Sequence, residues 1–135
     1  DSVLSVWDNA SSKDGSLQFK QYLSGHRSTV VSVTPFTYRT KHYLLSVGKD
    51  RQIRVWGLGQ DRCYEPEATL MKAHSRIVWS SCFVGECGDD ALLATGSRDM
   101  TVKVWGFDVV KREVNVRVCY SLDRSRGQPV RLRVP

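Results

Sequence analysis

The sequence has no long hydrophobic run and no leader segment. No uninterrupted apolar stretch approaches the roughly 18–20 residues that a membrane helix needs, so we expect no membrane contact. The chain opens with DSVLSVWD, which has no initiator Met, no basic region and no apolar core of a signal peptide. We therefore expect further sequence before residue 1, and a cytoplasmic location with the nucleus as a second compartment.

Cysteine pairs of the kind that bind zinc are also missing. The four cysteines are Cys63, Cys82, Cys87 and Cys119, and none is in a CxxC pair. A zinc site could be drawn from the closest two and His74, but paired short spacings are what distinguish such sites. We expect reduced and mostly buried thiols, with no metal and no cofactor.

The balance of charge is positive, and the rest of the composition is ordinary. Of the 135 residues, 41% are hydrophobic and 25% are charged, which is typical of a folded chain rather than a disordered one. Lys and Arg number 20 against 14 Asp and Glu, a formal charge of +6. Such an excess suits an anionic partner such as RNA, although a basic solvated surface gives the same count.

A tandem repeat with a period of 49 residues dominates the sequence. A Val-Trp pair preceded by a polar residue occurs three times, with its tryptophans 49 residues apart: Trp7, Trp56 and Trp105. An Asp lies six residues before each Trp, and a hydroxyl residue lies four residues before the second and third Asp: Asp1, Asp50, Asp99, Ser46 and Thr95. Gly25-His26 and Ala73-His74 open two complete units, 48 residues apart.

Within each unit the hydrophobic period is two, which predicts β-strands. Polar and apolar residues alternate up to Trp56 and again from Met100 to Trp105. Clusters of Gly, Asn, Asp, Ser and Pro separate these runs, as turns require. The expected strands cover residues 17–23, then 30–33, 43–47, 52–56 and 67–71, and then 77–83, 91–95, 100–105 and 114–120.

Four short antiparallel strands in each unit of this length predict the blade of a β-propeller. One blade cannot bury both of its faces, so blades stack on their neighbours. Closure takes about four to eight blades, so the fold class is all-β, with four-stranded antiparallel sheets in an incomplete propeller. We divide the chain into the end of one blade (1–24), two whole blades (25–72 and 73–122) and the start of another (123–135).

The units resemble WD40 repeats over nearly the whole chain. The shared features are a Gly-His opening, a hydroxyl in the second strand, an Asp in a tight turn and a Trp that ends the third strand. The resemblance implies one buried hydrogen-bonded tetrad in each whole blade, namely Trp56–Ser46–His26–Asp50 and Trp105–Thr95–His74–Asp99. Gly57 and Gly106 stand where the family name has Asp, which Trp7-Asp8 keeps, and residues 125–130 contain no His for a further tetrad.

A narrower resemblance rests on the runs LLSVGKDRQIRVW and AHSRIVWSS, followed by TGSRDMTVKVWG. These are similar to late blades of the second subunit of the Elongator complex, and residues 75–80 are the most distinctive part. The resemblance implies a non-catalytic scaffold that holds a large scaffold subunit and a catalytic subunit, in an assembly that modifies wobble uridines in tRNA. A WD40 scaffold of another complex is the alternative, because propellers of one fold bind different partners.

Ser46, His26 and Asp50 have the residue types of a hydrolase triad. However, a like trio recurs in the next unit, and no GxSxG elbow is present to expose a nucleophile. Each trio also comes with a Trp at fixed spacing, which suits a structural role better than catalysis. We therefore expect no catalytic residue, and a protein that is not an enzyme.

Direct RNA binding through a basic edge is a second alternative. In a WD40 blade the His loop and the Asp turn emerge on the same face, and this would align Arg27, Lys49, Arg51, Arg76 and Arg98, with Arg124, Arg126, Arg131 and Arg133 extending the charge. Clustered cations suffice for phosphate contacts, tRNA included. A rim that is merely solvated, or that pairs with an acidic protein, has the same charges. No stacking aromatic is expected among them, because the apolar neighbours of Trp79 predict a packed strand residue.

Overall fold

The computed structural model describes residues 1–9, 13–122 and 130–133, with side chains described up to residue 121. Within these ranges the chain forms strands and turns and contains no helix. The described residues therefore include no helix long and apolar enough to cross a membrane. The strands are β1 (Leu4–Asp8), β2 (Gln18–Leu23), β3 (Val30–Tyr38), β4 (Lys41–Gly48), β5 (Ile53–Leu58), β6 (Tyr64–Leu70), β7 (Val78–Cys87), β8 (Asp90–Ser97), β9 (Thr101–Asp108), β10 (Glu113–Leu122) and β11 (Val130–Arg133).

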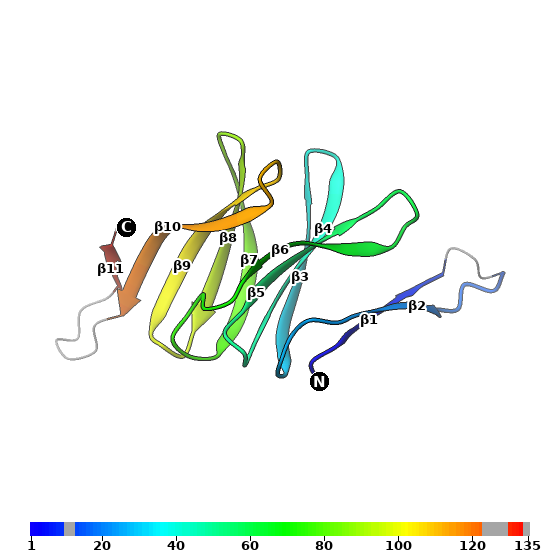
Figure 1. Cartoon of the computed structure of the whole chain (residues 1–135), viewed down its shortest axis with the longest axis horizontal. Coiled ribbons are helices and arrows are strands. Elements are labelled where there is room, and N and C mark those ends of the chain that lie inside the picture. The colour runs from blue at the N-terminus through cyan, green and yellow to red at the C-terminus, as the bar shows by residue number, and fades with distance from the viewer. Residues whose placement is uncertain (10–12, 123–129, 134–135) are drawn as a thin grey trace.

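The strands form three antiparallel sheets that follow one another along the chain (Figure 1). The first sheet contains β1 and β2, the second contains β3 to β6, and the third has the order β11-β10-β9-β8-β7. In the second and third sheets each strand pairs with its sequence neighbour, which is the meander of a propeller blade. The expectation of an all-β, incomplete propeller with four-stranded antiparallel sheets is confirmed.

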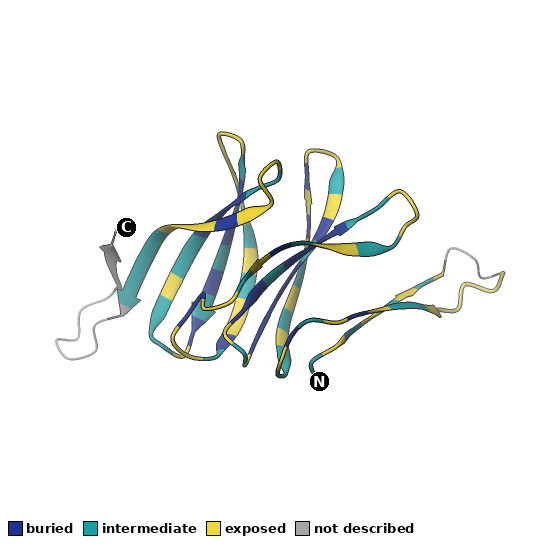
Figure 2. Ribbon diagram, viewed as in Figure 1, coloured by how far each residue is buried: buried dark blue, intermediate teal, exposed yellow. Residues whose placement is uncertain are grey.

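The main hydrophobic core lies between the second and third sheets. Buried side chains from β4 and β5 pack against those from β8 and β9, among them Leu45, Val55, Leu93 and Phe107. The ring of Phe36 stacks on that of Phe83 with centroids 5.2 Å apart. Figure 2 shows the buried residues on the strands of these two sheets. Each fully buried side chain of this size contributes about 1.5–3 kcal/mol, so packing between the sheets is their main source of stability.

The first strands of the two large sheets lie side by side, because β3 contacts β7 directly. Thr34 Oγ1 donates a hydrogen bond to the backbone oxygen of Ser81 at 2.9 Å, and the Ser32 and Ser81 hydroxyls are also 2.9 Å apart. These bonds fix the position of one sheet relative to the next along their inner strands. The loops at the ends of the two sheets are therefore also held in fixed positions relative to each other.

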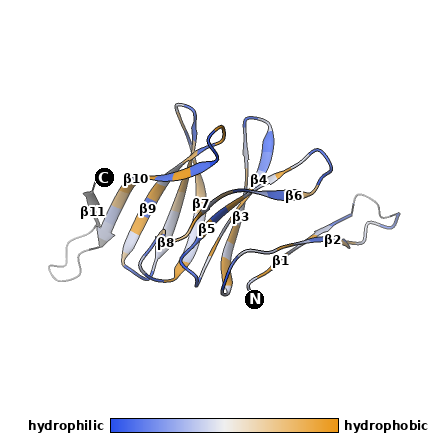
Figure 3. Cartoon of the chain, viewed as in Figure 1, coloured by the Kyte–Doolittle hydropathy of each residue, from blue (hydrophilic) through white to orange (hydrophobic). Residues whose placement is uncertain are grey.

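Apolar side chains also occur on sheet faces that no neighbouring sheet covers. Trp7 and Phe19 are exposed on the first sheet, and Val102 is exposed on the third. In Figure 3 apolar residues occur along the strands of the two large sheets, and hydrophilic residues occur in the loops and also on strands such as β2 and β6. Exposed apolar side chains on a sheet face suit a fold in which a further sheet packs against that face.

Several strand boundaries differ from the expected ones. β3 extends to Tyr38 rather than ending at residue 33, because Phe36 and Tyr38 continue the buried face of the strand. β6 begins at Tyr64, before the expected 67–71. Residues 123–129 lie outside the described residues, and β11 pairs with β10 in the third sheet. The division into the units 1–24, 25–72, 73–122 and 123–135 stays a prediction.

The expectation of mostly buried cysteines is wrong. All four are free thiols; Cys82 and Cys87 are exposed, and Cys63 and Cys119 are only partly buried. The reason is the alternation of β7, which directs Cys82 away from the face that carries Phe83. Among the described residues, no group of three or more His, Cys, Asp or Glu could hold a metal ion.

Candidate functional site

The first tetrad joins two strands, a loop and a turn of the second sheet. The Trp56 indole Nε1 on β5 donates to Ser46 Oγ on β4 at 2.9 Å. Ser46 Oγ lies 2.7 Å from Nε2 of His26, in the loop before β3. Nδ1 of His26 lies 2.8 Å from Oδ2 of Asp50, in the turn between β4 and β5. An indole N–H only donates and a carboxylate only accepts. Each residue of the tetrad therefore donates to the next, in the order Trp56, Ser46, His26 and Asp50.

The second tetrad repeats this arrangement in the third sheet. The Trp105 indole donates to Thr95 Oγ1 at 2.8 Å, and Thr95 Oγ1 lies 2.7 Å from Nε2 of His74. Nδ1 of His74 lies 3.0 Å from Oδ2 of Asp99. Thr101 adds a further bond by donating its hydroxyl to Oδ1 of Asp99 at 2.5 Å. The structure therefore brings together all eight residues that the resemblance placed in tetrads.

Burial sets the protonation state of both tetrads. It lowers the pKa of His26 and of His74, and this effect exceeds the opposite one of the neighbouring carboxylate. Burial alone would raise the pKa of Asp50, but hydrogen bonds from the backbone N–H groups of Arg27 and Gln52, and from His26, bring it below its usual value. The pKa of Asp99 is likewise below its usual value, because hydrogen bonds from Thr101, from His74 and from the Ser75 backbone outweigh the effect of burial. A neutral imidazole between a hydroxyl and an ionised carboxylate is the state that can accept at Nε2 and donate at Nδ1.

The tetrads are sealed from solvent, and this decides what they can do chemically. Ser46 and Thr95 are 0% and 1% exposed, and the side chains of His26 and His74 are fully buried. Both hydroxyls are buried, and each already bridges an indole and an imidazole. The tetrads fix strands and turns relative to each other, as satisfied buried polar networks do.

The five cations expected on one edge do lie together there. Arg27, Lys49, Arg51, Arg76 and Arg98 are all exposed, in loops and turns at the lower edge of the large sheets in Figure 1. We call this edge the rim, and define it as residues 25–29, 48–52, 71–77 and 97–100. Arg124 and Arg126 lie outside the described residues, and the side chains of Arg131 and Arg133 are not described.

Backbone hydrogen bonds connect the four segments of the rim. Lys49 N donates to Thr29 O at 2.9 Å, Ala73 N to Arg51 O at 3.0 Å, and Arg98 N to Ile77 O at 3.0 Å. The two Asp turns also share their geometry, because Arg51 and Met100 occupy equivalent positions with φ of 66° and 70°. The rim is therefore one connected surface across both sheets.

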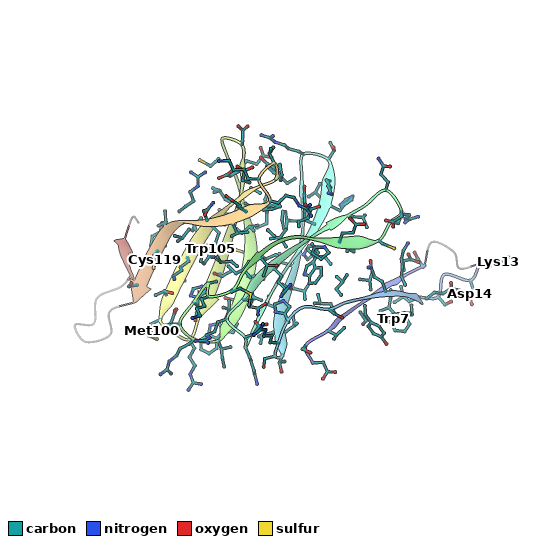
Figure 4. The ribbon with its side chains drawn as sticks, viewed as in Figure 1. Trp7, Lys13, Asp14, Met100, Trp105 and Cys119 are labelled. Carbon is teal, nitrogen blue, oxygen red and sulfur yellow. The ribbon has the colours of Figure 1, made fainter. Side chains whose placement is uncertain are left out.

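Two hollows open on the rim, one for each large sheet. The first has a volume of about 340 Å³, and its lining includes Arg27, Lys49, Arg51 and Lys72. The second has a volume of about 530 Å³ and is lined by Ser75, Arg76, Trp79, Arg98, Asp99 and Met100. Figure 4 labels Met100 at the lower edge of the third sheet. Cations thus occur in both hollows, and the second also contains an aromatic ring.

The expectation that Trp79 is a packed strand residue is wrong, because its side chain is 54% exposed. Val78 pairs with Ser97 and Ser80 pairs with Gly96, so Trp79 is the extra residue of a β-bulge. A bulge interrupts the in-out alternation, and this separates Trp79 from Ser81 and Phe83, the partly buried residues whose face it would share in a regular strand. Its repeat counterpart Val31, 48 residues earlier, lies in a matching bulge and is also exposed.

A known family of repeats matches most of the chain. The model of the family described as "WD domain, G-beta repeat" matches residues 17–57 and 64–106. The chain is 39% identical over 92 residues to Elongator complex protein 2 of Dictyostelium discoideum, covering 66% of this chain and 10% of that protein.

Two further relatives match over similar lengths. Elongator complex protein 2 of Schizosaccharomyces pombe is 33% identical over 101 residues, covering 74% of this chain and 12% of that protein. Coatomer subunit beta'-2 of Arabidopsis thaliana is 34% identical over 87 residues, covering 64% and 9%. The chain thus spans about a tenth of the length of these relatives. Each family match covers the last strand of one sheet and the first three strands of the next, and each contains one whole tetrad. The chain belongs to the WD40 repeat family.

Proposed function

We propose that this chain is part of a non-catalytic scaffold subunit of an Elongator-type complex, acting in the cytoplasm and with the nucleus as a second compartment. It would hold the large scaffold subunit and the catalytic subunit of an assembly that modifies wobble uridines in tRNA. The observation that carries this proposal is the likeness to Elongator complex protein 2, which reaches 39% identity and recurs in a second organism. The coatomer subunit, at 34%, is less similar than the Dictyostelium protein but about as similar as the Schizosaccharomyces protein, at 33%.

The internal chemistry of the blades supports a binding role. The hydroxyl, imidazole and carboxylate groups of both tetrads form hydrogen bonds to each other and are buried. What the molecule offers to other proteins is its rim, its loops and the faces of its sheets. A scaffold needs such rigid surfaces, and rigid strands with satisfied polar cores provide them.

The test is a mild-salt affinity purification of the tagged full-length parent protein, with mass spectrometry of the proteins that remain bound. Recovery of a very large scaffold subunit together with the catalytic subunit of the tRNA-modifying assembly would support the proposal. A set of vesicle-coat subunits would instead identify a coatomer-type scaffold and refute the Elongator assignment. The matched control is a purification with an unrelated tagged propeller, which removes proteins that bind this fold nonspecifically.

A second candidate function is direct binding of RNA by the rim. The specific observation in its favour is the connected row of exposed cations across both hollows. Charge reversal at Arg76 and Arg98 together should weaken association with tRNA, because each cation that neutralises a phosphate releases a counterion. Binding that is equal at low and high salt would remove the electrostatic basis of this candidate.

A further inference from the structure

We propose that the second hollow binds single-stranded RNA, with one base stacked on Trp79 and the flanking phosphates on Arg76 and Arg98. The proposal rests on the second candidate function above and names its ligand. It begins from the combination of one exposed indole and two guanidinium groups in a single hollow of about 530 Å³. A hollow of this size accommodates a nucleotide.

The exposed charge of the rim is of one sign. The four rim segments contain two carboxylates, Asp50 and Asp99, whose side chains are only 4% and 8% exposed. Both are held below the surface by the tetrads and by backbone N–H groups. The tetrads therefore withdraw the negative charge, and the cations project into solvent above them.

The guanidinium groups of the second hollow are available for a ligand. Among the described residues, Arg39, Arg112 and Arg117 form ion pairs with acidic side chains, whereas Arg76 and Arg98 form none. Arg98 is fixed through its backbone, which donates to Ile77 O. Two positioned cations without partners can neutralise phosphates with no internal ion pair to break.

The indole ring of Trp79 is also available to a ligand. The aromatic pairs and cation–π contacts of the described residues do not include it. Trp79 is the extra residue of the β7 bulge, and its side chain is 54% exposed. Val31, in the equivalent bulge of β3, is 42% exposed.

These features favour single-stranded RNA over an acidic peptide. Carboxylate side chains would use the two Arg residues but would gain nothing from an indole face, whereas every nucleobase has a π face that stacks on an aromatic ring. A base within a duplex is already stacked on its neighbours, so a paired strand could not use Trp79. The cations of the first hollow, Lys49 and Arg51 among them, continue the row and would carry further phosphates of the same strand.

The experiment measures binding of a fluorescein-labelled 12-nucleotide oligouridine and of a hairpin duplex of equal charge to the full-length parent protein. The proposal predicts tighter binding of the single strand. Trp79→Ala should weaken that binding by about 5- to 150-fold, the loss expected for one stacked base, and Trp79→Phe should retain most of it. The matched control Val31→Ala, at the equivalent bulge, should leave binding unchanged.

The arginines are tested in the same assay. Arg76→Glu with Arg98→Glu should weaken binding and flatten its salt dependence, by roughly 0.7 in the log–log slope for each phosphate that the variant no longer neutralises. Arg62→Glu with Lys111→Glu, on the exposed β5–β6 and β9–β10 loops away from the rim, changes the net charge equally and is the control. An unchanged melting temperature for each variant shows that the fold is kept.

The alternatives give different results. If the arginine variant loses binding while Trp79→Ala does not, the rim contacts phosphates only, and the stacking proposal is overturned while the second candidate function stands. If neither variant changes binding, or if no RNA binds, both are overturned. If a 12-residue oligoglutamate displaces the RNA and binds independently of Trp79, the ligand is an acidic peptide and the RNA assignment is wrong.

Discussion

Replacing Thr95 with Val tests whether the tetrad hydroxyl is the bridge that the geometry indicates. Val has nearly the shape of Thr, so the change removes the hydroxyl with little change in packing. In the native protein Thr95 Oγ1 accepts from the Trp105 indole at 2.8 Å and lies 2.7 Å from Nε2 of His74. Without it, a buried donor and a buried acceptor both lose their partners. Each such group costs about 1–3 kcal/mol, which gives roughly 2–6 kcal/mol in total.

The matched control is Thr95→Ser, which keeps both hydrogen bonds and removes only a methyl group. Its cost is about 1 kcal/mol, from the smaller apolar area that it buries. Urea unfolding of the full-length parent protein, followed by tryptophan fluorescence, compares the two variants with the native protein. If Val and Ser variants unfold at the same urea concentration, the hydroxyl does not bridge these groups and the reasoning fails.

A double-mutant cycle separates the indole from the imidazole. Trp105→Phe removes the indole N–H, so that Thr95→Val in this background leaves only the His74 nitrogen without a partner. The cost of Thr95→Val should therefore fall by about 1–3 kcal/mol relative to its cost in the native background. Equal costs in both backgrounds would show that Trp105 and Thr95 are not energetically coupled.

The other predictions concern single perturbations of the same framework. Asp99→Ala should lower the free energy of unfolding by roughly 1–3 kcal/mol, because it leaves His74 without its carboxylate; an unchanged melting temperature would contradict this. Because burial lowers the pKa of His26 and His74, the stabilising effect of their neutral forms is complete above about pH 6.5 and is lost as the pH falls through their lower folded values. Urea midpoints measured between pH 8 and pH 5 should therefore decrease, and a flat profile would show that these histidines do not titrate on unfolding. Gly25→Ala should destabilise the first whole blade by about 1 kcal/mol or more, because Gly25 has φ of +152° and a Cβ there would lie 2.5 Å from Arg54 Nη1. Arg54→Lys should restore part of that loss in thermal melts, as in the second repeat, where Lys103 stands opposite Ala73.

The tetrads could be predicted from the sequence because their chemistry is repeated at fixed spacing. Trp56 and Trp105 each stand ten residues after a hydroxyl and six after an Asp. These spacings resemble WD40 repeats, and it is that resemblance which implied the tetrads and the order of their bonds. The order agrees with the donors and acceptors that the four residues carry. Alternation of polar and apolar residues gave the strands for a similar reason, since each strand has one face in the core.

What the tertiary structure alone decided concerns exposure and register. Regular alternation would place Trp79 on the partly buried face of Ser81 and Phe83, yet a bulge after Val78 leaves it exposed beside the rim. A bulge depends on how one strand pairs with the next, and alternation within a single strand does not contain that information. The exposure of Cys82 and the extension of β3 to Tyr38 depend instead on which face of each strand the neighbouring sheet covers.

The rim likewise needed the fold as a whole. The sequence placed Arg27, Lys49, Arg51, Arg76 and Arg98 on one edge through the geometry of the repeat. It did not show that backbone hydrogen bonds connect those loops across two sheets. The burial of Asp50 and Asp99 beneath them, in contrast, agrees with the tetrads that the resemblance implied. Charge is a property of residues, but an electrostatic surface depends on which charges the packing leaves in water. Which charged side chains remain exposed depends on how the sheets pack together, and the pattern within a single strand does not determine it.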